Sequence, residues 1–112
     1  MTTTKNRTVG ALLTTSNADL YTVPANYEAN IKAIYVNNSS TSSRTFSLDW
    51  YNLKETTYYT LAEQVTMPPH SLLQITDNMW LAKGDKFRGL ASAADAVTVT
   101  FNVEELFVPN RT

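Results

Sequence analysis

Alternation of apolar and polar residues is the strongest pattern in this chain, and it limits what the chain can fold into. Phe46, Leu48 and Trp50 are separated by single polar residues, and the run from Val97 to Val103 repeats the arrangement. Successive side chains of a strand point to opposite faces, so a period of two predicts strands with one buried face. No window has the spacing of a long amphipathic helix.

Strands are predicted about every ten residues, with turn signals between them. Pro24 lacks an amide hydrogen and ends one strand, while Gly84 and Asp85 predict a tight bend. An all-β, single-domain antiparallel β-sandwich of the jelly-roll type follows, and the absence of crossover helices argues against a parallel α/β fold. The roughly eight strands are placed at residues 9–15, 20–23, 31–36, 45–51, 57–61, 72–75, 86–91 and 97–103.

The polar segment "NNSSTSSR", residues 37–44, lies between two of these strands. Asn and Ser side chains bond their own backbone and tolerate the dihedral angles of a turn. The segment is therefore predicted to be the tip of a hairpin that joins two antiparallel neighbours. The alternative is a loop that contacts a partner.

Both ends of the chain are predicted to form arms that lie across adjacent subunits. The polar start "MTTTKNRT" gives an N-terminal arm at residues 1–8. Glu104 and Glu105 interrupt an otherwise apolar strand, so the strand is expected to bulge or leave the sheet there and to continue as a C-terminal arm at residues 106–112. The domain itself spans residues 1–112.

Composition excludes several classes of function. The net charge is −1, charged residues make up 17% of the chain, and the nine basic residues are dispersed, whereas binding of nucleic acid needs them clustered on one face. The chain has no cysteine, so it has no disulfide and no thiolate ligand or nucleophile. No apolar run approaches the length of a membrane span, so we do not expect the protein to associate with a membrane.

Catalytic residues are not predicted. His70 is the single histidine and stands beside two prolines in a turn, which supports neither a catalytic triad nor a multi-histidine metal site. Asp77 and Asp85 fall in expected loops without the pattern of a calcium loop, and they are interpreted as solvated turn residues. Phosphate-binding glycine loops and nucleophile motifs are missing. We predict no enzyme activity, no metal and no cofactor.

Aromatic residues are the remaining functional resource, because interfaces favour Tyr and Trp as anchors. Tyr58 and Tyr59 are adjacent, so one of them is expected to point outward from its strand. Trp50 and Trp80 are alternative platforms for a glycan-binding module. The predicted interface residues are Lys5, Arg7, Tyr58, Tyr59, Pro68, Pro69, His70, Leu106, Phe107 and Arg111.

Two stretches, "LYTVPANYEANIKAIYVNNSS" and "MPPHSLLQITDNMWLAKGDKFRGLASAADAVTVTFNVEE", resemble a class of small virion proteins of tailed bacteriophages. The shared motifs are L-Y-x-V-P-A, a strand that ends in V-x-N, a corner containing proline and L-x-x-G-D. They span residues 20–105, and they are turn signatures without catalytic residues. This chain has Pro68-Pro69-His70 at the corner where the class has proline followed by glycine.

The resemblance implies a non-enzymatic virion protein. Its expected role is capsid decoration or cement, bound to the outer face of the major capsid protein or to other virion proteins, in virions assembled in the cytoplasm of a host bacterium. A homo-oligomer is expected, of which a trimer is one form. The alternatives are a neck or tail connector, a fibre-associated protein and the glycan-binding module.

Overall fold

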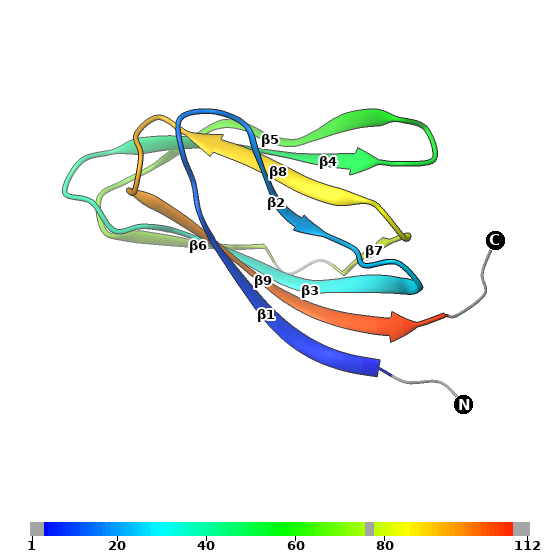
Figure 1. Ribbon diagram of the computed structural model, residues 1–112. Helices are drawn as coiled ribbons and strands as arrows, with labels where there is room; N and C mark the ends of the chain where they lie inside the picture. The colour runs from blue at the N-terminus through cyan, green and yellow to red at the C-terminus, as the bar shows by residue number, and fades with distance from the viewer. Residues whose placement is uncertain (1–3, 76–77, 109–112) are drawn as a thin grey trace.

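The computed structural model describes residues 4–75 and 78–108, which form two antiparallel β-sheets packed face to face (Figure 1). Within these residues no helix is present that could span a bilayer. Sheet A contains β1 (Thr4–Leu12), β9 (Val97–Phe107), β3 (Tyr27–Asn38), β6 (Ser71–Ile75) and β7 (Met79–Leu81). Sheet B contains β2 (Ala18–Thr22), β8 (Lys86–Ala91), β4 (Arg44–Asn52) and β5 (Thr57–Met67).

The strand order is that of a jelly roll. Sheet A runs β1-β9-β3-β6, with β7 also paired to β3, and sheet B runs β2-β8-β4-β5. The chain changes sheet between nearly all consecutive strands, and the hairpin from β4 to β5 stays within sheet B. All of the pairings are antiparallel. The predicted all-β sandwich is therefore confirmed, as one compact domain.

The core lies between the sheets and is built by the alternation seen in the sequence. Phe101 of β9 and Phe87 of β8 are fully buried and stack across the two sheets, with ring centroids 5.0 Å apart. Phe46 and Leu48 of β4 point into the same space. Other buried apolar residues are Leu13, Ile31, Val36, Leu81, Val97, Val99 and Val103.

The segment after β3 crosses between the sheets, so the hairpin prediction for residues 37–44 is wrong. β3 belongs to sheet A and β4 to sheet B, and they do not pair with each other. Asn38 at the end of β3 is fully buried, and its amide donates hydrogen bonds to the carbonyl oxygens of Ser42, Met67 and Pro68 at 2.9–3.1 Å. Its Oδ1 accepts from the backbone N–H of Ser40 at 3.0 Å. These hydrogen bonds of Asn38 hold the crossing segment in place, whereas a hairpin would have been held by the pairing of its two strands.

The bend before β8 has the predicted conformation, but one of its residues has an unexpected role. Gly84 adopts a φ of 83°. Asp85 accepts a hydrogen bond from the backbone N–H of Ala82, as expected, and a second from that of Leu53 in the β4–β5 turn. Asp85 is buried, so it was wrongly interpreted as solvated. It ties together two turns at one end of the sandwich.

Residues 4–8 and 106–107, which were predicted as parts of terminal arms, are strand. Residues 4–8 belong to β1, which pairs with β9 along its length, and Leu106 and Phe107 are the last residues of β9. β9 does not leave the sheet at Glu104 and Glu105. Residues 1–3 and 109–112 lie outside the described residues, as do Thr76 and Asp77.

Candidate interaction surfaces

The side of the sandwich formed by β5, β6 and β7 carries most of the large exposed apolar side chains. β5 is the outermost strand of sheet B, and β6 and β7 form the corresponding edge of sheet A (Figure 1). We call this the open side of the sandwich. The large exposed apolar residues on these strands are Tyr58, Tyr59 and Leu61 of β5, Leu72 and Leu73 of β6, and Trp80 of β7.

An apolar slot opens between the two sheets on this side. Its volume is about 250 Å³, and it is lined by Ile34, Leu48, Leu61, Ile75, Asn78 and Met79. Ile34 and Leu48 are core residues, so the slot reaches the core of the sandwich. A surface of this kind favours contact with an apolar partner, because covering it would remove from water the exposed Leu61 and the partly buried Ile75 and Met79.

Tyr58 lies in a compact cluster on the outer face of sheet B. Its ring packs against that of Tyr51, with centroids 4.6 Å apart, and the guanidinium of Arg88 lies 3.4 Å from its centroid. Arg88 also donates a hydrogen bond to Asp49 at 2.9 Å, and Lys86 lies over Tyr51. Tyrosine and arginine held in fixed positions are typical of protein-binding hot spots. Sequence reasoning found Tyr58 but missed Tyr51, Lys86 and Arg88, which only the strand register brings beside it.

Tyr59 points toward the other face of β5, as the predicted alternation requires. Its ring stacks on Trp50, with centroids 5.2 Å apart. Trp50 is thereby covered and offers no free platform for a sugar ring. Trp80 is 60% exposed and stands opposite Asn30 on the outer face of sheet A.

Lys5 and Arg7 both form ion pairs with Glu105, and their side chains remain 50% and 44% exposed. They lie on β1 directly beside the inward-pointing Glu105 of β9, which is fully buried. Glu105 accepts hydrogen bonds from Arg7 at 3.1 Å and from the Tyr21 hydroxyl at 2.6 Å, and the Lys5 ammonium lies 3.5 Å away. These bonds compensate the cost of burying a carboxylate, and they explain why β9 continues through Glu105.

Tyr21→Phe is expected to change how stability depends on alkaline pH. Burial, together with the Glu105 carboxylate beside it, raises the pKa of Tyr21 well above its usual value of 10. Above about pH 10 the unfolded chain therefore loses this proton before the folded protein does, so the stabilising contribution is complete below pH 10 and declines as the pH rises. Unfolding free energy measured in urea at pH 8 to 11 should fall less steeply in the variant. Parallel curves for both proteins would contradict this role.

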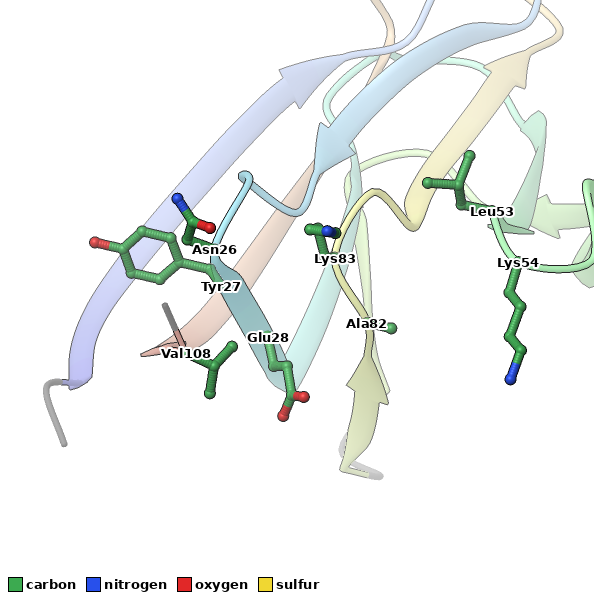
Figure 2. A pocket seen from close by; sticks show the side chains of 8 residues that line it. All are labelled: Asn26, Tyr27, Glu28, Leu53, Lys54, Ala82, Lys83 and Val108. Atoms are coloured by element: carbon green, nitrogen blue, oxygen red, sulfur yellow. The ribbon is translucent and has the colours of Figure 1, made fainter. Parts of the chain in front are cut away.

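Leu106 and Phe107 line the end of the sandwich where β9 stops. Phe107 packs on Tyr27 with ring centroids 5.4 Å apart, and the backbone N–H of Val108 donates to the carbonyl of Asn26 at 2.7 Å. An open pocket of about 440 Å³ adjoins them, with Tyr27 and Val108 on one wall and Leu53 and Lys54 on the other (Figure 2). The other residues around it are Asn26, Glu28, Ala82 and Lys83.

The predicted corner at Pro68, Pro69 and His70 is exposed and connects β5 to β6. His70 adopts a φ of 53°, and its backbone N–H donates to the carbonyl of Ser40. Tyr58 is at the opposite end of β5, roughly 30 Å away along an extended strand. The structure therefore does not join the corner and the tyrosines into one site. Arg111 lies outside the described residues.

The described residues contain no cluster with the geometry of a metal site, since no group of three or more His, Asp or Glu side chains converges among residues 4–75 and 78–108. The end pocket and the slot of the open side are both lined mainly by apolar atoms. What these surfaces can do chemically is bury apolar area against a partner.

Comparison with known proteins identifies the fold. No family model matches the chain, and no curated protein matches its sequence. Among solved structures, the chain is similar to the subunit of Bacillus endospore appendages, described as disulfide-linked pili, with a TM-score of 0.55 and 13% identity over 96% of this chain and 88% of that one. It is also similar to the protein of virus-like particles of the extra small virus of the prawn Macrobrachium rosenbergii, with a TM-score of 0.52 and 12% identity over 94% and 79% of the two chains.

A third similar structure is that of the VP2 subviral particle of infectious bursal disease virus, with a TM-score of 0.51 and 10% identity. The match covers 94% of this chain and 33% of VP2, so the chain corresponds to about one third of that protein. At these identities the likeness establishes a shared β-sandwich fold. The chain has the fold of subunits that build pili and viral shells.

Proposed function

We propose that this chain is a non-enzymatic structural protein of a bacteriophage virion, and that it is a decoration or cement protein bound to the outer surface of the capsid. In this role it packs against the major capsid protein and stabilises contacts between capsid subunits. It is assembled into virions in the cytoplasm of the host bacterium. The sequence motifs shared with small tailed-phage virion proteins support the bacteriophage assignment.

The single observation that carries the proposal is the combination of fold and surface. The jelly roll is used by the similar proteins as a unit that is repeated in pili and viral particles. This chain adds an apolar open side and a rigid cluster of Tyr51, Tyr58 and Arg88 on the outer face of sheet B. A patch of roughly 800 Å² per partner is enough for stable association, and repetition over a lattice multiplies weak contacts.

A place at the neck or tail is the second candidate. The similarity to a pilus subunit favours it, because that protein builds a filament. Copy number distinguishes the two positions. A capsid surface holds on the order of hundreds of copies. At the neck or tail the number of copies is a small multiple of the order of the rotational symmetry.

The proposed function is tested on purified virions with and without the protein. Quantitative mass spectrometry should find on the order of hundreds of copies in each particle. Particles that lack the protein should release their DNA at a lower temperature than complete particles, and adding the purified chain back should restore the original temperature. Absence of the chain from virions would contradict the proposal, and a copy number of six or twelve would move it to the neck or tail.

A further inference from the structure

The open side of the sandwich is almost free of charge. In the three described strands β5, β6 and β7, Glu63 is the one charged residue. The opposite side differs, because β1 carries Lys5 and Arg7 and β2 is short and carries Asp19. Charged residues and short strands protect sheet edges from pairing, and the centres of interfaces are depleted of charge. One side of the protein is therefore protected and the other is not.

β5 is also long for an unprotected edge. It has 11 residues, it is rich in β-branched and aromatic side chains, and it contains no proline. One of its edges pairs with β4, and no strand within residues 4–75 and 78–108 pairs with the other. Residues 57–60 follow β4 in regular register, and two bulges come after them. The regular part of β5 is a free template for another strand.

We propose that the open side binds a second copy of this chain, with the two β5 strands paired antiparallel about a two-fold axis near Tyr59. Sheet B of each copy would then continue into sheet B of the other, and each copy would cover the apolar slot of its partner. A two-fold contact uses the same edge in both copies and closes the assembly as a dimer. The bulges after residue 60 disrupt the regular edge of β5, so the paired segment is confined to the residues before them.

A second copy fits this side better than a charged partner would. The net charge of −1 gives copies of the chain little mutual repulsion, and a surface with the single charge of Glu63 offers little to a basic or acidic ligand. With the axis near Tyr59, residues 57–61 of one β5 strand face the same residues of the other copy, so the unpaired backbone donors and acceptors of one edge meet the complementary groups of an identical edge.

The dimer is tested by the mass of the purified chain in solution. Light scattering after size-exclusion chromatography, over a range of concentrations, should give twice the chain mass. Leu61→Glu should weaken the dimer at least about 100-fold, because it places a charge at the apolar slot that the partner copy would cover. The matched control is Leu12→Glu, an exposed leucine on β1, and it should leave the dimer intact. A monomeric wild-type chain, or a folded Leu61→Glu variant with unchanged mass, would overturn the proposal.

Single cysteines give a second readout that does not depend on weakening the interface. The chain contains no cysteine, so each introduced thiol reports one position. Under mild oxidation Tyr59→Cys, Thr60→Cys or Leu61→Cys should yield a disulfide-linked dimer, with the highest yield nearest the axis, whereas Leu12→Cys should remain monomeric in a denaturing gel. Equal yields at all four positions would indicate random collision and would contradict the pairing.

The dimer adds a self-contact to the proposed virion role, and the two can fail separately. If the isolated chain is monomeric but still restores the stability of virions, the dimer is wrong and the virion role stands. If the chain dimerises through β5 but is absent from virions, the dimer stands and the virion role is wrong.

Discussion

Phe101→Ala is expected to lower the free energy of unfolding by about 3–5 kcal/mol, the range for removing a buried aromatic ring. Phe101 is fully buried in β9, between β1 and β3, and its ring stacks on Phe87 of the opposite sheet at 5.0 Å. The truncation removes the stacking on Phe87 and the contact with Tyr21 across the two sheets, and paired strands on both sides limit how far the cavity can collapse. Urea unfolding followed by tryptophan fluorescence measures the effect.

The matched control for Phe101→Ala is Leu12→Ala. Leu12 is 51% exposed on the outer face of β1, so its truncation should change the unfolding free energy by less than about 0.5 kcal/mol. A loss below about 1 kcal/mol for Phe101→Ala would mean that the two sheets are not held together at this point.

Asn38→Asp is expected to lower the free energy of unfolding by about 3 kcal/mol or more, although it replaces only the side-chain NH2 group by an oxygen. The amide nitrogen of Asn38 donates to three backbone carbonyl oxygens, those of Ser42, Met67 and Pro68. A carboxylate would place a second oxygen against these acceptors, in a position without exposure to water. Leaving buried polar groups unpaired costs about 1–3 kcal/mol each, and burying a charge adds to that cost.

Asn37→Asp is the control, because Asn37 is the preceding residue and its side chain is exposed. It should change stability by less than about 0.5 kcal/mol. Urea unfolding at neutral pH compares the two variants. Lowering the pH should recover part of the loss in Asn38→Asp, because a protonated carboxyl can again donate one hydrogen bond. Equal effects of the two substitutions would show that the crossing between sheets does not depend on Asn38.

The proposed function depends on the surfaces that this scaffold presents. The same sandwich can carry many functions, so the fold alone does not assign one. In this chain the exposed apolar and aromatic residues gather at the open side, formed by β5, β6 and β7, and in the tyrosine cluster around Arg88 on the outer face of sheet B. The two surfaces share Tyr58, which lies on β5 and packs against Tyr51 and Arg88. The proposed dimer uses the edge of β5, and it leaves the part of the cluster on β4 and β8 available for another partner.

The predicted interface residues stay a prediction, and the structure shows where most of them lie. Tyr58 and Tyr59 lie on an exposed edge strand, and the Pro68 to His70 corner is exposed. Lys5 and Arg7 serve an internal ion pair with Glu105. Leu61, Leu72 and Leu73 were missed, because an apolar residue in a strand is read from sequence as core. Only the position of β5 and β6 at the sheet edges exposes them.

The amino-acid sequence by itself determined that this chain forms strands, which face of each strand is buried and where many of the turns fall. These properties depend on neighbours one to four residues apart, such as the alternation along β4 and β9 and the glycine at position 84. Tertiary structure alone decided which sheet each strand joins and which edges stay free. Glu105 shows the reason, because its partners Tyr21 and Arg7 lie 84 and 98 residues away in the sequence. From its neighbours alone, this carboxylate predicts that the strand leaves the sheet. In the folded protein it is stabilised inside the sheet by groups that no local pattern reveals.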